Sequence, residues 1–463
     1  MTERISRRQM LKEGLMVAGG AAAATPLLLQ GGQLLTAYAS PAISLPWPEA
    51  NAIIAQTTVP TFPNATFPVT NYGAKGDGKT DNTAAFAKAI AACNATGGGH
   101  VVVPAGTYST GAIHLLSNVD FHLDAGATLM FNGTASNYPP VLTRYEGEEC
   151  LNHSPLVYAY GQTNIALTGS GVLDAAGTAS WNTGSNRAGV LDPLLNLPPM
   201  QRNVVGKLRV TFVEPYNCTN VLIQGVTLRH TQFWNLHPTL CTNVTIDGVT
   251  VTAPGRGNSD GCDPESCDHV VINNSSFTCM DDTIAIKSGR NADGRRLHTP
   301  CQNIVIMNSR FDSNRGMVAI GSEETGGVQN VYCFNLSSFG ANVWAALYIK
   351  NNSLRGGFVK NVNMDTIKAT TTRSTAPAVI YAIMNYNGET GAFPPVIDQI
   401  HVNNMVADHS PYAIRLVGLS SDHIGTVTVS NSTFTSITHQ ANSVSNVDHL
   451  ILTNVTINGQ PAH

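Results

Sequence analysis

Two short stretches carry the pattern that decides the fold: NVLIQGVTL at Asn220–Leu228 and NVTIDGVTV at Asn243–Val251. In both, apolar and polar residues alternate with period two, and the run then breaks at glycine, as a short strand followed by a turn does. Further copies are HVVINNSSF from His269, NIVIMNSRF from Asn303, NVYCFNLSSF from Asn330, TVTVSNSTF from Thr426 and HLILTNVTI from His449.

A repeat of this length indicates a solenoid, because one unit is too short to bury its own apolar face. Equivalent strands of stacked coils would pair in parallel at about 4.8 Å. A β-sandwich or a propeller is the alternative, but each period holds too few strands for a propeller blade. A cysteine precedes each of the first four units by two positions, at Cys218, Cys241, Cys267 and Cys301. The repeated cysteines and asparagines are expected to form interior and turn columns.

One helix stands before these strands. Apolar residues from Ala85 to Cys93 have helical spacing, Asp81 or Thr80 is a candidate N-cap, and Gly97 is a candidate stop. We therefore predict an all-β protein, a single-stranded right-handed parallel β-helix, capped by one short helix over residues 81–96.

The N-terminal segment, residues 1–39, has the order of an export signal. SRRQMLK at residues 6–12 carries paired arginines, a Gly/Ala-rich apolar stretch follows at residues 14–29, and small residues stand at Ala37 and Ala39. A membrane anchor is the alternative, but the apolar stretch is shorter than the roughly 20 residues of a spanning helix. We predict a twin-arginine-type signal peptide over 1–39, an irregular Pro-rich arm over 40–66 and a catalytic β-helix over 67–463. The mature protein would be periplasmic or extracellular, without membrane attachment.

The composition argues against nucleic acid as a partner and against a metal site. Only 12% of the 463 residues are charged and the formal net charge is −4, so the chain has no general basic surface for nucleic acid. Nine cysteines leave at least one unpaired. Cys262 and Cys267 could bridge, but buried thiols are favoured, since twin-arginine substrates are exported folded. No Cys/His cluster has zinc spacing, and we predict neither a metal nor a cofactor.

In this chain poor in charge, CMDDTIAIKSG at residues 279–289 has two adjacent aspartates, Asp281 and Asp282. This coil aligns without a gap with the next one, so that Asp281 faces Arg315 and Ile284 faces Val318. If Ile284 and Ile286 point inward, Lys287 points outward as a solvated charge. Strict alternation would bury Asp282, which is costly for an unpaired charge, so we expect a bend that lets both aspartates reach the surface.

Neighbouring coils place further polar residues in the same column. Asp260 precedes Asp281 by close to one coil. In ALYIKNN at residues 346–352, Tyr348 and Lys350 would point outward. Trp234 and His237, one coil earlier, could line the same groove.

Three close carboxylates cannot all ionise freely, so at least one pKa should be raised. A carboxyl group with a raised pKa can act as a general acid while an ionised neighbour activates water. An inverting glycosidase works in this way, with its two carboxyl groups roughly 6.5–9.5 Å apart. Nearby cations would suit an anionic sugar. Alternatively, the adjacent aspartates are solvated or bind calcium, and Arg315 only neutralises Asp281.

These residues give the chain a resemblance to glycoside hydrolase family 28, the polygalacturonase-type pectinases. The resemblance rests on NSD at Asn258–Asp260, MDD at Met280–Asp282 and the coil repeats around them. It implies that Asp281 is the general acid, that Asp260 and Asp282 hold and activate water, and that Asn258 belongs to the substrate site. The implied reaction is hydrolysis of α-1,4-galacturonosyl linkages in pectin.

Two motifs depart from the family. Arg315 stands where the family has the histidine of G-H-G, and Tyr348 replaces the arginine of R-x-K, whose lysine is kept as Lys350. In the family these side chains hold the substrate, so Arg315, Tyr348 and nearby Arg355 are candidate substrate contacts here. Rhamnogalacturonan is therefore a rival substrate. A calcium-dependent lyase and a non-catalytic carbohydrate-binding solenoid are alternative functions, and we expect a monomer.

Overall fold

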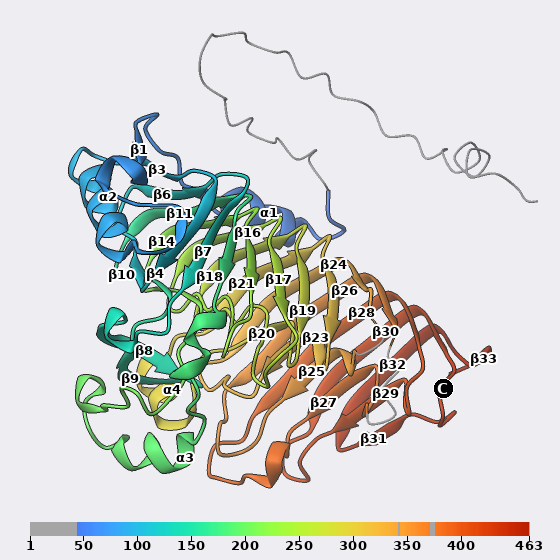
Figure 1. The fold of residues 1–463 in the computed structure, drawn as a ribbon. Helices are drawn as coiled ribbons and strands as arrows, with labels where there is room; N and C mark the ends of the chain where they lie inside the picture. The colour runs from blue at the N-terminus through green and yellow to red at the C-terminus, as the bar shows by residue number, and fades with distance from the viewer. Residues whose placement is uncertain (1–43, 341–342, 371–375, 463) are drawn as a thin grey trace, which may run out of the picture. The chain divides into compact units, whose positions relative to one another are not determined.

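The computed structural model describes residues 44–340, 343–370 and 376–462. The predicted signal peptide therefore lies outside the described residues, and its assignment stays a prediction. Residues Leu45–His463 form one compact unit (Figure 1). No helix in the described part of the chain is long and apolar enough to cross a membrane.

Parallel strands stack coil upon coil into three walls, with every pairing along each wall in parallel. Wall 1 contains β1 (Thr66–Pro68), β3 (Gly99–Val103), β6 (Val119–Leu123), β11 (Thr163–Gly169), β14 (Thr219–Gln224), β16 (Thr242–Asp247), β18 (Asp268–Asn273), β21 (Cys301–Met307), β24 (Val328–Ser338), β26 (Phe358–Thr370), β28 (Val396–Asp408), β30 (Ile424–Thr435) and β32 (Val447–Ile457). Wall 2 contains β2 (Asp77–Asp81), β4 (Gly106–Thr110), β7 (Ala127–Phe131), β12 (Val172–Asp174), β15 (Thr227–Arg229), β17 (Thr250–Ala253), β19 (Ser276–Cys279) and β22 (Arg310–Ser313), and it merges with wall 1 at β24.

Wall 3 carries the candidate site. It contains β5 (Ile113–His114), β10 (Val157–Tyr160), β13 (Val213–Tyr216), β20 (Ile284–Ile286), β23 (Gly316–Gly321), β25 (Ala345–Lys350), β27 (Ile380–Ile383), β29 (Ile414–Val417) and β31 (Ser443–Ser445). Between β13 and β20 the wall continues through isolated bridges at Leu236 and Cys262 rather than full strands. This irregular part of wall 3 is where Asp260 lies.

The register confirms the predicted parallel β-helix. Val270 and Ile272 of β18 pair with Ile304 and Ile306 of β21, and their side chains are buried in one continuous core. The gap-free alignment predicted for the next wall is also confirmed, because Ile284 pairs with Val318.

The repeated asparagines and cysteines form turn columns, as predicted. Asn220 and Asn243 have φ of 56° and 58°, a left-handed conformation that asparagine tolerates better than most residues. The Asn243 amide donates to Oδ1 of Asn220 at 2.9 Å. In the cysteine column, the backbone N–H of Cys241 donates to Sγ of Cys267 at 3.4 Å. All nine cysteines lie in the described residues and are buried free thiols, which agrees with the favoured interpretation.

Helix α2 (Thr83–Ala95) closes the first coil, and Phe86 and Ile90 on its buried face join the core. Its N-cap position is Asn82 rather than Asp81 or Thr80, although Oδ1 of Asp81 accepts from the Thr83 N–H at 3.0 Å. The predicted capping helix is therefore present, with its start shifted by one or two positions.

A second helix, α1 (Pro48–Gln56), was not predicted and lies in the arm expected to be irregular. Pro48 at its first position is already set to helical φ. Trp47 packs on Tyr332 with ring centroids 5.5 Å apart, and Ile53 joins the same apolar cluster against wall 1. Apolar packing on the strands therefore supports a helix that its proline-rich context disfavours.

Two inserted segments, together called the insertion, were also missed: one lies between β7 and β10, and the other between β12 and β13. The insertion contains the antiparallel hairpin of β8 (Pro140–Tyr145) and β9 (Glu148–His153), and helix α3 (Arg187–Val190). Figure 1 shows this hairpin beside α4 (Asn291–Leu297), which follows β20. The insertion thus reaches the coil that holds the aspartate pair.

Candidate active site

The three predicted carboxylates come together where wall 2 turns into wall 3. Asp282 lies two positions before β20, and Asp260 lies two positions before the bridge at Cys262. The Gly261 N–H donates to the carbonyl of Asp282 at 3.0 Å, which fixes the two coils relative to each other. Asp260, Asp281 and Asp282 can each present an oxygen such that all three oxygens lie within 4.8 Å of one another.

Serine side chains hold the bend on which these aspartates stand. The Ser259 hydroxyl donates to the carbonyl of Ala253 at 2.9 Å and accepts from the Met280 N–H at 3.0 Å. One coil later, the Ser313 hydroxyl donates to the carbonyl of Asp281 at 2.5 Å. The predicted bend is thus present, and hydroxyl groups satisfy the backbone where strand pairing stops.

The bend does not expose both members of the aspartate pair. Asp281 is half-buried, whereas Asp282 is only 1% exposed. Oδ2 of Asp282 accepts from Nζ of Lys350 at 2.6 Å, and Oδ1 accepts from the Gly316 N–H at 2.8 Å. The expectation of a surface position for Asp282 is wrong, because Lys350 supplies the partner that makes its burial tolerable.

The electrostatic setting differs among the carboxylates. Burial raises the pKa of Asp260 well above its usual value, and the neighbouring charges of Asp263 and Asp281 raise it further. Burial and the charge of Asp282 raise the pKa of Asp281, against the lowering effect of Lys350 and Arg315. Oδ1 of Asp260 is buried without a hydrogen-bond partner among the described residues. The raised pKa that was expected for at least one carboxyl group is therefore found for two, Asp260 and Asp281.

Asn258 and Arg315 border this cluster. Asn258 has a left-handed backbone with φ of 57°, and its N–H donates to Oδ2 of Asp281 at 3.3 Å. Arg315 is exposed, with its guanidinium carbon 4.7 Å from the ring centroid of Trp344. Arg315 thus remains available to a substrate at the open side of Asp281.

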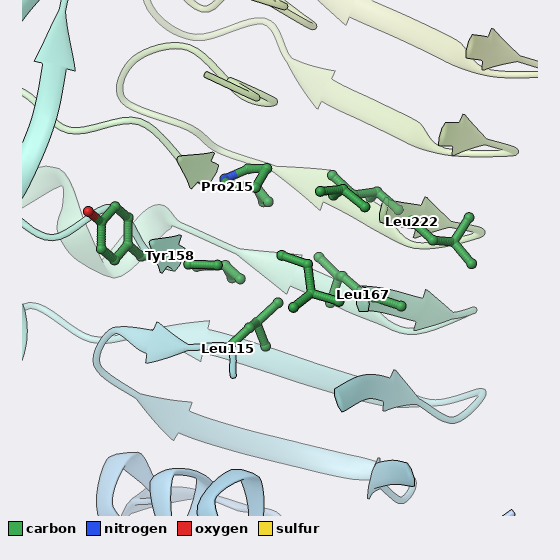
Figure 2. A pocket seen from close by; sticks show the side chains of 12 residues that line it. Leu115, Tyr158, Leu167, Pro215 and Leu222 are labelled. Atoms are coloured by element: carbon green, nitrogen blue, oxygen red, sulfur yellow. The ribbon is translucent and has the colours of Figure 1, made fainter. Parts of the chain in front are cut away.

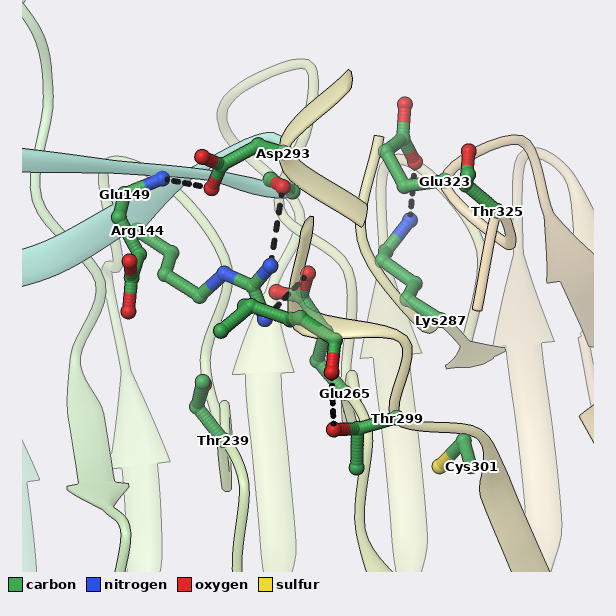
Figure 3. Close-up of polar contacts among 12 residues, drawn as sticks. Arg144, Glu149, Thr239, Glu265, Lys287, Asp293, Thr299, Cys301, Glu323 and Thr325 are labelled. Atoms are coloured by element: carbon green, nitrogen blue, oxygen red, sulfur yellow. Dashed lines mark hydrogen bonds and ion pairs between the residues drawn. The ribbon is translucent and has the colours of Figure 1, made fainter. Parts of the chain in front are cut away.

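Lys287 is not the solvated charge that alternation suggested. It is 3% exposed, and its Nζ lies 3.1 Å from Glu323, 3.6 Å from Asp263 and 4.4 Å from the ring centroid of Trp234. Figure 3 shows the contact with Glu323. Burial raises the pKa of Asp263 to about 7, against the opposing effect of Lys287 and His237. Asp263, beside the predicted carboxylates, was missed.

His237 and Trp234 do not line an open groove. His237 is fully buried, with Nε2 2.8 Å from Glu265 and Nδ1 3.5 Å from Glu214. Burial lowers the pKa of His237, but the contacts with both glutamates outweigh it and raise the pKa to about 9. Trp234 is also buried and stacks on Phe233, with ring centroids 5.0 Å apart.

The insertion covers these residues. Tyr145 at the end of β8 stacks on Phe233 at 4.8 Å, and Arg144 makes a buried ion pair with Glu265 at 3.2 Å (Figure 3). The Arg290 N–H donates to the carbonyl of Gly147 at the hairpin turn, at 3.0 Å. The insertion therefore covers wall 3 at the coil of Phe233 and Trp234, and its hairpin also contacts the next two coils at Glu265 and Arg290.

Arg355 also departs from its expected position. It is 1% exposed, and Nη1 lies 2.9 Å from Glu389 and donates to Oδ1 of Asn291 at 2.9 Å. The paired Arg355 is therefore a support for the side of the groove rather than an open substrate contact. Tyr348 and Lys350 do point outward, since Tyr348 packs in an outer cluster apart from the core.

Sequence reasoning missed three buried acidic residues near the aspartates: Asp263, Glu265 and Glu323. Only the first two left a signal in the sequence. Asp263 and Glu265 stand two positions apart in DPES, the spacing of one strand face. Glu323 follows the end of β23, where no periodic pattern remains.

An apolar hollow elsewhere in the solenoid has no comparable polar side chains. It lies in earlier coils and is lined by apolar side chains such as Leu115, Leu167 and Leu222 (Figure 2). The hydroxyl of Tyr158 at its side already donates to the carbonyl of Leu142 at 2.6 Å. The carboxylate cluster therefore remains the candidate active site.

Comparison with known proteins agrees with the fold and the motifs. The profile described as "Glycosyl hydrolases family 28" matches residues 93–449. A "Probable polygalacturonase" of Vitis vinifera is 29% identical over 383 residues, covering 78% of this chain and 73% of that protein.

Solved structures give the same result. The crystal structure of a hyperthermoactive exopolygalacturonase from Thermotoga maritima has a TM-score of 0.81 and 34% identity, covering 89% of this chain and 96% of that one. A Yersinia enterocolitica family 28 exopolygalacturonase, at 21% identity and a TM-score of 0.71, shares the fold, with 87% of this chain and 77% of that one covered. The chain belongs to glycoside hydrolase family 28 and is a glycoside hydrolase with a pectinase-type parallel β-helix.

Proposed function

We propose that this protein is an exported inverting hydrolase that cleaves α-1,4-galacturonosyl linkages of pectin. The observation that carries the proposal is the cluster of Asp260, Asp281 and Asp282, whose oxygens approach within 4.8 Å beside two cations, Lys350 and Arg315. The names of the similar proteins support polygalacturonate as the substrate class.

The proposed roles follow from exposure and charge. Asp281 is reachable from outside and has a raised pKa, which suits a group that must donate a proton to the leaving oxygen. Asp282, ion-paired with Lys350, accepts a proton from the attacking water. Asp260 holds that water, because its unpartnered Oδ1 is a free acceptor beside the pair.

The proposed inversion of anomeric configuration rests on the hydrogen bonds of Asp282 and not on the distances between the carboxyl groups. The oxygens lie closer than the roughly 6.5–9.5 Å typical of inverting carboxyl pairs. However, both oxygens of Asp282 accept from protein donors, so Asp282 is poorly placed to attack a sugar as a nucleophile. Water is then the nucleophile, and configuration inverts.

The same hydrogen bonds disfavour a calcium site. A cation bound by all three carboxylates would have to share Asp282 with the ammonium of Lys350, 2.6 Å away. Calcium-dependent lysis thus has less support than hydrolysis.

We propose exo action for a geometric reason. The insertion covers wall 3 up to Trp234 and His237, immediately before the coil of Asp260. A saccharide chain entering from the open side would end there, and cleavage would release its terminal unit. Two of the structural neighbours carry exopolygalacturonase in their titles.

One experiment tests reaction and substrate together. The protein is incubated with polygalacturonate and with rhamnogalacturonan, and product size and anomeric configuration are read by chromatography and NMR. We expect galacturonate monomer of inverted configuration from polygalacturonate, with little early loss of viscosity. Cleavage of rhamnogalacturonan alone would move the substrate to that polymer, and retained configuration would contradict the water mechanism.

Substitutions and product analysis distinguish a hydrolase from the two alternative functions, a calcium-dependent lyase and a carbohydrate-binding solenoid. Asp281→Asn should lower kcat by about 10²–10⁴, whereas Asp247→Asn, on wall 1, should leave it unchanged. An unsaturated, UV-absorbing product suppressed by chelators would instead establish a lyase. Unchanged function in Asp281→Asn would favour a carbohydrate-binding solenoid.

Export is a separate part of the proposal. The paired Arg7 and Arg8 before an apolar stretch support twin-arginine transport. Arg7→Lys together with Arg8→Lys should retain the protein in the cytoplasm of a bacterial host, as cell fractionation would show. Unchanged export would contradict this route.

A further inference from the structure

The outward column of wall 3 changes character beyond the catalytic carboxylates. Ala285, Ala319, Tyr348, Tyr381 and Arg415 pair in register on successive strands β20, β23, β25, β27 and β29. The two alanines are fully buried in one outer cluster with the two tyrosines. The column therefore changes from small side chains near Asp282 to aromatic and cationic side chains farther along the wall.

The three larger side chains form one continuous stack. The rings of Tyr348 and Tyr381 are 5.2 Å apart with planes 7° from parallel, and the guanidinium carbon of Arg415 lies 5.5 Å from the Tyr381 centroid. Tyr348 is 4% and Tyr381 7% exposed, so their outer edges alone reach the surface. Within the described part of the chain, neither hydroxyl makes a hydrogen bond to the protein. Both hydroxyls are therefore free to bind a ligand.

Arg415 is half-buried and lacks the carboxylate partner that two buried arginines have. Arg290 and Arg355 each contact a carboxylate, whereas no carboxylate of the described residues lies within ion-pair distance of Arg415. Its Nε is buried with no acceptor in the same residues. A buried donor without an acceptor is unfavourable, and an anion bound at Arg415 would remove that deficit.

The stack lies where a long substrate would extend. β29 is four strands beyond β20, which at about 4.8 Å per strand puts Arg415 roughly 19 Å along the wall from the catalytic coil. The opposite direction is covered by the insertion. A saccharide several units long with one end at Asp281 therefore has to run toward the tyrosines.

We propose that Tyr348, Tyr381 and Arg415 form a binding ladder for the uncleaved part of an acidic oligosaccharide. The tyrosine edges and hydroxyls contact successive sugars, and Arg415 pairs with a uronate carboxylate several units from the bond that breaks. The chemical class of this ligand rests on the proposed function. The consequence is that long acidic substrates bind more tightly than short ones.

Calorimetric binding to Asp281→Asn tests the ladder without turnover. The probes are galacturonate dimer and hexamer and the methyl-esterified hexamer, each measured with and without the added change Arg415→Gln. We expect the added change to weaken hexamer binding about tenfold, which corresponds to about 1.4 kcal/mol. Dimer binding and methyl-esterified hexamer binding should stay unchanged.

Arg310→Gln is the matched control, because Arg310 is exposed over the ring of Phe339 on another part of the molecule. It should alter none of the three affinities. Tyr381→Phe keeps the stack and should cost less hexamer affinity than Tyr381→Ala, with thermal unfolding used to confirm that both fold.

The two proposals fail in different ways. Equal loss for dimer and hexamer, no loss for either, or no hexamer binding by Asp281→Asn would overturn the ladder. If the unmodified protein hydrolyses no pectic polymer while Arg415 still governs hexamer affinity, the ladder stands and the hydrolase function falls.

Discussion

At the scale of single residues, the site is organised by charges that are buried and compensated. Strand alternation indicated that burial of Asp282 would be costly, but the expectation that a bend exposes Asp282 was wrong, because the local pattern could not supply its partner. That partner is Lys350, 68 positions later in the chain and 2.6 Å away in space. Burial of one charge can be judged from a local pattern, whereas its compensation depends on how coils stack.

Removing Lys350 should therefore affect both folding and activity. Lys350→Met leaves Asp282 buried without its cation, which typically costs about 3–5 kcal/mol of stability. We also expect kcat/KM on polygalacturonate to fall by about 100-fold or more. Urea unfolding and steady-state kinetics measure the two effects.

Lys360→Met is the control, since Lys360 is exposed and its ammonium lies over the ring of Phe358 on wall 1. It should change neither quantity. Full activity with unchanged stability in Lys350→Met would refute the role given to the ammonium.

The raised pKa of Asp260 makes a prediction with a definite sign. Burial, with Asp263 and Asp281, favours the protonated form in the folded protein, against the opposing charge of Lys287. Stability from this group is fully present below the unfolded pKa near 3.8 and is lost as pH rises toward the folded value.

Asp260→Asn removes that loss, because the amide does not ionise. Relative to the unmodified protein, the variant should gain stability as pH rises above the unfolded pKa, while its activity falls sharply. Thermal unfolding from mildly acidic to neutral pH is the measurement. A stability difference that is independent of pH would show that the carboxyl is not protonated on folding.

At the scale of strands and turns, the repeat predicted what depends on period two and on stacking. The pairing of Ile284 with Val318 and the columns of Asn243 and Cys241 were all accessible from sequence. They could be predicted because each coil repeats the same local structure. An inward pair of apolar residues is followed by a turn that needs a residue with left-handed backbone conformation.

The asparagine turns can be tested directly. Asn243 has φ of 58° and donates to Asn220, so Asn243→Ala loses a hydrogen bond and places a β-carbon in a strained region. We expect a loss of about 1–3 kcal/mol in free energy of unfolding. Asn243→Gly should lose less, because glycine adopts positive φ freely. Equal losses in denaturant unfolding would assign the effect to the hydrogen bond alone.

The sides of the groove could not be predicted in the same way. Lys287, Trp234 and His237 occupy outward positions, where alternation predicts solvent. They are buried because the hairpin and its neighbours, from a different part of the chain, cover that face. A periodic pattern reports on the coil that carries it and says nothing of a distant insertion packed on top.

At the scale of the whole described unit, each coil contacts mainly its two neighbours, so stability should vary along the stack. α2 closes the first coil. At the other end, β32 pairs with β30 on one side and with the short β33 (Gln460–Pro461) on the other. Ile451 of β32 is 48% exposed there. The middle coils around β18 are paired on both sides and fully buried within.

Hydrogen exchange should reveal this gradient. Amides of β31 and β32 should exchange first, those of the last complete coils next, and those of β16, β18 and β21 last, because opening at the free end breaks the fewest neighbour contacts. The catalytic coil would then stay closed while the end of the ladder near Arg415 opens more readily. Mass spectrometry resolved by peptide measures the order, and a single rate for all coils would mean that the solenoid opens as one cooperative unit.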